Sequence, residues 1–309
     1  MLTKIFIQNA GYYIILASTV GLIMNFSVFS QFLKSERTSF YIMCTSQSVS
    51  NILTSMIYFG YIGVSYVLYL PLGPSWLNGY MNQSVGYGLI VMGSLTQMMI
   101  TINRFLVVFF TLYSRVRDVS KYSNQVTVVG LAVCWMSSGW LSVLPGWSEH
   151  CFIKSSLDHL GWSSTPCSIN FGYLMFATLL IIGITSNFLN ILIARKLMVS
   201  AKNQSLSSEM SKKRRENAKK FFIQSLCQDW IYVLQMLICY YFIRWFEKDT
   251  VGQFMSEMGC DVLVPVVDGL IMFSFNYREK KTLREIKNSN NSDSMKAFEK
   301  PKISVCSVK

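Results

Sequence analysis

The sequence contains little charge for its length of 309 residues: Asp, Glu, Lys and Arg make up 14% of it, against about 25% in an average soluble protein. A stretch of 66 residues, from Thr38 to Asn103, holds no acidic, basic or histidine side chain. A water-soluble domain does not easily bury such a stretch, whereas a bilayer core takes roughly 20 apolar residues per helix. The missing charge therefore indicates a membrane protein and excludes disorder along most of the chain.

Residues that carry catalysis or bind metals are also scarce. The chain has two histidines, His150 and His159, and both fall in one predicted outer loop. The sequence shows no metal-ligand spacing of His and Cys, no nucleophile elbow and no phosphate-binding loop. It therefore predicts no enzyme, no metal and no cofactor. A net charge of +12 would suit a nucleic-acid-binding protein, but a mean hydropathy of +0.35 excludes nucleic acid as the partner.

Seven apolar segments are present instead, each long enough to cross a bilayer. They cover approximately residues 11–33, 40–64, 83–110, 126–145, 170–194, 221–243 and 254–275. Lipid offers the backbone no hydrogen bonds, so we expect helices; the alternating segments of a β-barrel are absent. The sequence thus predicts an all-α membrane protein: a seven-transmembrane helix bundle over residues 1–286 and a disordered cytoplasmic tail over residues 287–309.

The basic residues indicate the orientation of this bundle. When the N-terminus is placed outside, 24 of the 28 Lys and Arg residues fall on the inner side, as the positive-inside rule requires. An odd number of spans then places the C-terminus inside. We therefore expect a multi-pass protein of the plasma membrane with its N-terminus outside.

Two features of the outer segments depend on this topology. Cys151 and Cys167 both fall in the loop after the fourth span, where a disulfide closing a loop of this length would contribute about 3 kcal/mol; two free surface thiols are the alternative. Of four Asn-x-Ser sequons, only the one at Asn82 is predicted to lie outside the membrane on the outer side. Its glycosylation is left open by the sequence.

Polar residues inside the spans recur at helical spacing. Gln47 and Asn51 share one face of the second span, and Asp229 lies beside a line of glutamines on the sixth. Interhelical hydrogen bonds, each worth only about 0.6–2 kcal/mol, are the simplest role for the amides. An ionised carboxylate at this depth costs roughly 2.5 kcal/mol or more, so Asp229, Asp261 and Asp268 require a cation, a proton or a water-filled cavity.

Several short motifs resemble those of rhodopsin-like G-protein-coupled receptors. The third span ends in Thr101-Ile102-Asn103-Arg104-Phe105, Asn25 takes the place of the asparagine of the first helix, and Asp268-Gly269 takes that of the Asn/Asp-Pro pair of the seventh. The departures are that Gly269 replaces the proline and that Gln47 and Asn51 stand where an Asp is expected, which puts a sodium site in doubt.

With these departures, the sequence resembles the nematode chemosensory receptors, and among them serpentine receptor class X. The resemblance extends over roughly residues 11–285. It rests on the order and spacing of the following motifs: Thr38-Ser39-Phe40 before Ser46-Gln47-Ser48-Val49-Ser50-Asn51, Ile102-Asn103-Arg104-Phe105, Cys151 with Cys167, Phe222-Ile223-Gln224-Ser225-Leu226-Cys227-Gln228, and Asp268-Gly269 before Phe275-Asn276-Tyr277-Arg278.

The resemblance implies a chemosensory receptor of a sensory cilium that activates a heterotrimeric G protein. Asn103 and Arg104 would then receive the G protein together with Lys219 and Lys220 of the basic run before the sixth span. For Arg104 the alternative is an anchor at the membrane interface. For the two lysines it is a topology signal or contact with acidic membrane lipid.

The outer segment before the first span has only about ten residues, so we expect a ligand that enters the bundle, either a small molecule or a peptide. Depth alone selects the candidate contact residues, and packing or interfacial anchoring is the alternative for each aromatic. These candidates are Tyr87, Tyr240, Tyr241, Trp245, Glu257 and Asp261. If Asp261 is a counter-ion, the ligand is cationic.

A membrane transporter or a ligand-gated channel that uses the intramembrane carboxylates is the competing hypothesis, because such groups can relay protons. Against a transporter, the sequence shows no repeated half and no pair of Gly/Pro-broken helices. Against a channel of the insect odorant type, the charge distribution gives the opposite orientation.

Overall fold

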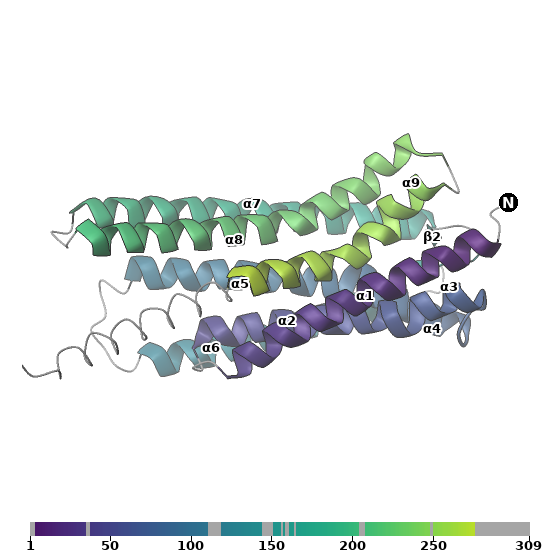
Figure 1. The fold of residues 1–309 in the computed structure, drawn as a ribbon, viewed down its shortest axis with the longest axis horizontal. Helices are drawn as coiled ribbons and strands as arrows, with labels where there is room; N and C mark the ends of the chain where they lie inside the picture. Colours follow the sequence, from purple (N-terminus) through teal and green to yellow (C-terminus); the bar gives the residue numbers. More distant parts are fainter. Residues whose placement is uncertain are drawn as a thin grey trace, which may run out of the picture.

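The computed structural model describes residues 4–34, 38–110, 119–143, 151–155, 157, 161–163, 165–203, 208–247 and 250–275. Within these residues, seven helices are long and apolar enough to cross a membrane, so the predicted fold class is confirmed. They run side by side as an elongated bundle (Figure 1). The helix ends next to the N-terminus form what we call the outer end.

Among the first three spans, the second and third contain interruptions of their α-helical geometry. The three spans are built from α1 (Lys4–Leu33); from α2 (Ser39–Ile57), η1 (Tyr58–Gly63) and α3 (Val64–Leu68); and from α4 (Ser75–Gln83), η2 (Ser84–Gly88) and α5 (Leu89–Phe110). Both η1 and η2 are π-helical and lie toward the outer end. The chain leaves α3 through Tyr69 in the left-handed conformation and enters α4 after Pro74.

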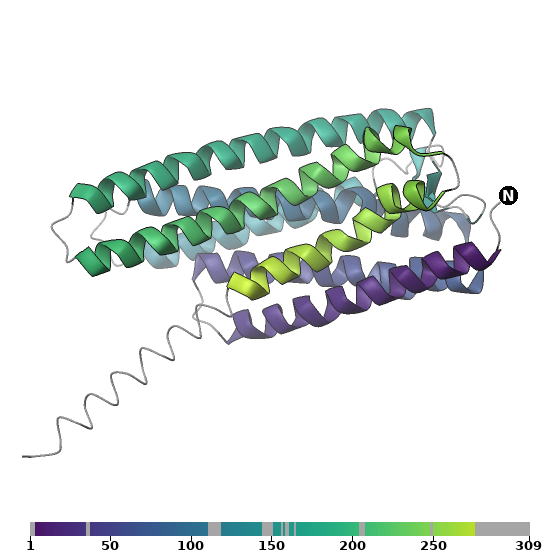
Figure 2. The same cartoon turned by 45° about the horizontal axis from the view of Figure 1, so that its top comes forward.

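The remaining four spans continue to cross the bundle in alternating directions. They are α6 (Val119–Val143), α7 (Pro166–Asn203), α8 (Ser208–Tyr240) with η5 (Phe242–Trp245), and α9 (Val251–Phe254) with the π-helical η6 (Met255–Gly259) and helix onward to residue 275. The outer loop before α7 contains β1 (Lys154–Ser155) and β2 (Trp162–Ser163), which pair antiparallel. The last span lies between α1 and α8 in both views (Figures 1 and 2).

The third helix begins at Ser75, well before the apolar limit predicted near residue 83. The added turns are polar, and their side chains have partners in the outer loop. Asn78 Nδ2 donates to the carbonyl of Ser155 at 3.2 Å, and Lys154 Nζ donates to Ser75 Oγ at 2.8 Å. Hydropathy does not detect such turns because contacts outside the lipid stabilise them.

Helix α5 is the centre of the bundle and packs against α2, α6, α7 and α8. Helix α1 packs on α2 and α3, where a Cβ at Gly11 would lie 2.7 Å from the backbone nitrogen of Val67. Large apolar side chains cover the outside of the bundle: Met136 and Trp140 on α6 and Ile181 on α7 are each about two thirds exposed. In a bilayer, where helices gain little from hiding apolar surface from lipid, these side chains face the acyl chains.

Candidate ligand pocket and intramembrane polar network

A cavity of about 250 Å³ lies at the outer end, between η2, the β1–β2 loop, α7, α8 and η6. Its walls combine aromatic rings with carboxylate and amide groups. Its lining includes Tyr87, Trp162, Gln235, Tyr240, Glu257 and Asp261. A concave site with an apolar wall and a few convergent polar groups is typical of small-molecule binding.

The two carboxylates of the cavity come from consecutive turns of the last span, and both are nearly buried. Trp162 contacts both: its backbone N–H donates to Glu257 Oε2 at 2.7 Å and its indole N–H donates to Asp261 Oδ2 at 3.1 Å. Asp261 also accepts from Gln235 Nε2 at 2.5 Å and from the thiol of Cys239 at 3.5 Å. The outer loop is thereby tied to the last span.

Four of the six ligand candidates selected by depth reach this cavity: Tyr87, Tyr240, Glu257 and Asp261. The Tyr87 hydroxyl donates to the carbonyl of Ser168 at 3.1 Å. Tyr241 and Trp245 do not line the cavity. Tyr241 packs its half-exposed ring against Phe176, and Trp245 is 78% exposed.

Trp162 and Gln235 belong to the cavity but were not among the sequence-based ligand candidates. Gln235 lies on the line of polar residues of the sixth span, four residues before Cys239, and this pattern predicts interhelical contacts more readily than a ligand site. Trp162 lies in a loop, where no periodicity applies. Its position between the two outer cysteines is the only sequence signal that brings it near the bundle.

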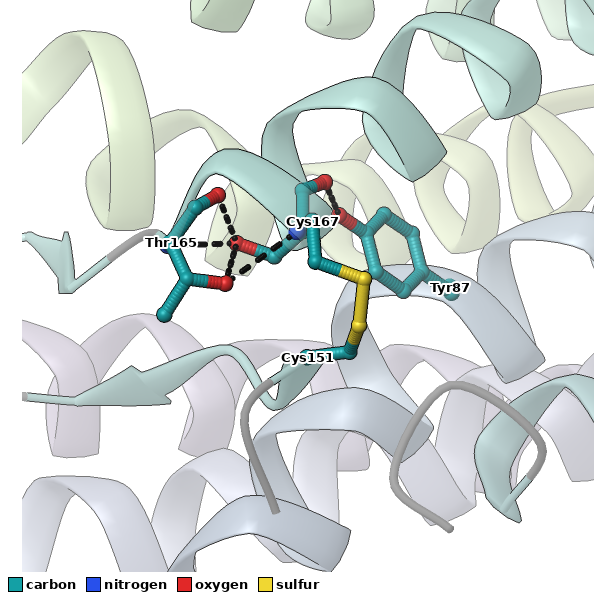
Figure 3. Close-up of a disulfide and its surroundings, with 5 residues drawn as sticks. Tyr87, Cys151, Thr165 and Cys167 are labelled. Carbon is teal, nitrogen blue, oxygen red and sulfur yellow. Dashed lines mark hydrogen bonds between the residues drawn. A yellow bond between two sulfur atoms is a disulfide. The ribbon is translucent and has the colours of Figure 1, made fainter. Parts of the chain in front are cut away.

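Cys151 and Cys167 form a disulfide, with their Cα atoms 5.1 Å apart, so the alternative of two free thiols does not describe this structure. Cys167 lies in the first turn of α7, where Thr165 and Ser168 exchange hydrogen bonds: Thr165 N donates to Ser168 Oγ at 2.8 Å and Ser168 N donates to Thr165 Oγ1 at 3.2 Å. Figure 3 shows the disulfide beside Tyr87 of the cavity wall. The disulfide thus attaches the start of the loop to the rim of the cavity.

A second polar cluster lies deeper, around the fully buried Asp268. Its carboxylate accepts three amide N–H groups: from Asn51 at 2.7 Å, from Gln228 at 2.7 Å and from Gln47 at 3.0 Å. Gln47 Nε2 also lies 2.7 Å from the hydroxyl oxygen of Tyr232. Asp268 of the last span is therefore held by amides from α2 and α8.

Asn25 extends this cluster to α1. Its Nδ2 donates to the carbonyl of Pro265 at 2.9 Å, and its Oδ1 accepts from Asn51 Nδ2 at 3.0 Å. The five intramembrane polar residues selected from the sequence are Asn25, Gln47, Asn51, Asp229 and Asp268. Four of them form one network, and Asp229 lies elsewhere.

Asp229 belongs to a third cluster toward the inner end of the bundle. Its carboxylate accepts from Asn190 Nδ2 at 3.3 Å, and that nitrogen lies 3.5 Å from the Thr101 hydroxyl. Arg104 donates to the Ser225 hydroxyl on α8, and its guanidinium lies 5.2 Å from the centre of the Phe40 ring on α2. Arg104 therefore points into the bundle and contacts its neighbours there.

The other coupling candidates are less informative. Asn103 follows Ile102 on α5 and is half-buried. Lys219 and Lys220 lie in α8, so the basic run continues the sixth helix, but their side chains are outside the described part of the structure. The predicted tail over residues 287–309 also lies outside it.

Comparisons with known proteins agree with this architecture. Squid rhodopsin superposes with a TM-score of 0.66, covering 98% of this chain and 94% of that chain at 13% sequence identity, and such low identity shows the fold alone. No curated protein matches the chain. A family profile described as "Serpentine type 7TM GPCR chemoreceptor Srx" matches residues 15–276. The match covers most of the chain, which therefore belongs to the Srx family of serpentine seven-transmembrane chemoreceptors.

Proposed function

We propose that this multi-pass membrane protein is a chemosensory receptor of the plasma membrane. In this proposal a small ligand binds in the outer cavity, and the inner end activates a heterotrimeric G protein. A sensory cilium is its site of action. The family and the rhodopsin-like fold make the chain a G-protein-coupled receptor and not an enzyme.

The observation that carries the proposal is the arrangement of one face of α8. Gln235 contacts Asp261 in the outer cavity, Gln228 contacts Asp268 in the middle, and Ser225 contacts Arg104 at the inner end. These α8 residues recur at the spacing of one helix face. A displacement of α8 would therefore change all three clusters together.

Such a helix provides the two-state element that a receptor needs. A ligand shifts an equilibrium only as far as it prefers one state over the other. A ligand in the outer cavity contacts α8 directly through Gln235, Met236 and Tyr240. If it favours a different position of α8, the contact between Ser225 and Arg104 breaks and the inner end opens to a partner.

The test is a ligand screen in cells that carry a promiscuous G-protein reporter, with Arg104→Ala as the paired variant. We expect the variant to reach the cell surface and to lose ligand-evoked signalling, because it lacks the guanidinium that would receive the G protein. Surface labelling of both proteins controls for expression. Undiminished signalling by the variant would refute the role of Arg104.

The competing transporter and channel hypotheses are separated from the receptor by a different measurement. The same chain is expressed in cells that lack heterotrimeric G proteins. A receptor produces no response there, whereas solute uptake or ionic current evoked by the ligand would favour a transporter or a channel.

A further inference from the structure

Three side chains bring hydrogen-bond acceptors to the outer cavity. Glu257 and Asp261 contribute carboxylates, and Gln235 contributes an amide oxygen, Oε1. Resting on the proposed function of this cavity as the ligand site, we propose that its ligand is a small organic cation with N–H groups, of the class of protonated primary amines.

Gln235 provides the first argument, independent of the acids. The side chain is 4% exposed, and its Nε2 is committed to Asp261 at 2.5 Å. Its Oε1 is buried and has no hydrogen-bond partner in the described part of the structure. A buried amide oxygen without a donor is unfavourable, and this one belongs to a residue of the cavity wall. A hydrogen-bond donor on a bound molecule would satisfy this oxygen.

The acids provide the second argument. Glu257 and Asp261 lie one helical turn apart, and the groups that donate to them are a backbone amide, an indole, two side-chain amides and a thiol. All of these donors are neutral. Among the described residues, the cavity wall contains no Lys, Arg or His. An ionised carboxylate in a buried site is unfavourable without a positive partner, and a cationic ligand would supply that partner.

The aromatic side chains and the size of the cavity narrow the ligand further. Tyr87, Trp162 and Tyr240 line the same space as the acids, and the faces of such rings attract organic cations. A volume of about 250 Å³ lies just below the roughly 300–1,000 Å³ of typical drug-sized sites. The cavity therefore suits an alkylamine or arylalkylamine of modest size.

The test measures binding to the purified full chain in lipid nanodiscs, without a G protein. The probes are matched triplets with one carbon skeleton and three head groups: hexylamine, hexanol and hexanoate, and phenethylamine, phenethyl alcohol and phenylacetate. We expect the amines at millimolar concentration to raise the thermal unfolding midpoint by about 2–4 °C, and the alcohols and carboxylates to leave it unchanged.

Two isosteric variants locate the effect. Asp261→Asn and Glu257→Gln remove the negative charges and should raise the half-maximal amine concentration at least about tenfold. Glu247→Gln is the matched control, because it removes an acid from an exposed outer position that does not line the cavity. It should leave the amine response unchanged. If an acid variant does not fold, the comparison of head groups on the unmodified chain still decides.

Alcohols or carboxylates that stabilise the chain as well as the amines do, or amines that have no effect, would overturn the inference. An amine response that survives both acid substitutions would overturn it as well. The outcome is separable from that of the reporter assay. Amines that stabilise the chain without evoking G-protein signalling would support the cation site and leave the coupling to the reporter assay, because a ligand that binds both states equally does not shift their equilibrium.

Discussion

Gly269 occupies the place where the resemblance to rhodopsin-like receptors leads one to expect proline, and the structure gives a reason for the glycine. A Cβ at this position would lie 2.7 Å from Asn25 Nδ2 and 2.9 Å from Asn25 Cγ. Asn25 in turn donates to the carbonyl of Pro265. The absence of a side chain at residue 269 thus lets the first and last spans approach closely enough for this bond.

We expect Gly269→Ala to lower stability by roughly 1–3 kcal/mol, because the methyl group must displace the Asn25 amide from a packed interior. The thermal unfolding midpoint of the purified chain measures this loss. Gly139→Ala on α6 is the matched control, since a Cβ there meets no atom within 4 Å. It should be neutral or slightly stabilising because alanine favours helix more than glycine does. Equal midpoints for the two variants would contradict this explanation.

Asn82 begins an Asn-x-Ser glycosylation sequon, but its side chain is buried in the structure. It is 0% exposed, and its Nδ2 donates to the carbonyl of Asn78 at 2.7 Å. A glycan is attached through this nitrogen, so the folded chain has no room for one. We expect peptide N-glycosidase F to leave the electrophoretic mobility of the chain unchanged.

A variant with an added Asn-x-Ser sequon before Met1 is the positive control for this measurement, because the expected topology places the N-terminus on the outer side of the membrane. It should show a mobility shift on enzyme treatment. A shift in the unmodified chain that disappears in Asn82→Gln would show that Asn82 is accessible.

At the scale of elements, two of the described π-helical segments, η2 and η6, flank the outer cavity. Segment η2 carries Tyr87, and η6 carries Glu257. A π-helical turn places one extra residue in the helix and rotates the following side chains, and such turns occur often at functional sites. The cavity residues Tyr87 and Glu257 thus both lie in segments that depart locally from α-helical geometry.

The disulfide between Cys151 and Cys167 should stabilise the outer loop. Closing a loop of this length contributes about 2–4 kcal/mol through the unfolded state, so the double variant Cys151→Ser/Cys167→Ser should have a clearly lower unfolding midpoint. Cys227→Ser is the control, because Cys227 is free and exposed. A reducing agent should lower the midpoint of the unmodified chain and leave that of the double variant unchanged. If the double variant matches the unmodified chain, the loop needs no covalent attachment.

The seven helices could be predicted because each span is a long apolar run, and the lipid forces such runs to form helices. The cavity could be predicted only in part. Depth along the helix is similar for Tyr240 and Tyr241, but consecutive residues of an α-helix differ by about 100° in direction, so only one of them lines the cavity. Trp162 could not be placed because its position depends on the strand pair and on the disulfide.

At the scale of the whole molecule, the polar residues form clusters at the outer end, in the middle and at the inner end of the bundle. The middle cluster around Asp268 joins α1, α2, α8 and the last span. The long stretch without charge between Thr38 and Asn103 thus contributes neutral side chains to this cluster: Gln47 and Asn51 of α2 donate amide N–H groups to Asp268 of the last span. The basic residues gather at one side of the bundle and thereby indicate its orientation. The buried acids are the centres of the polar clusters inside it.

The two hydrogen bonds of Trp162 have a consequence for ligand discrimination. The acids of the outer cavity are already occupied by a tryptophan of the chain itself, through its backbone and indole N–H groups. A molecule that engages the same two oxygens, Glu257 Oε2 and Asp261 Oδ2, competes with this resident donor. Its apparent affinity is its intrinsic affinity multiplied by the fraction of time in which Trp162 has released them. Weak neutral donors gain nothing from that exchange. The outer loop therefore sets a threshold that favours molecules with a full positive charge.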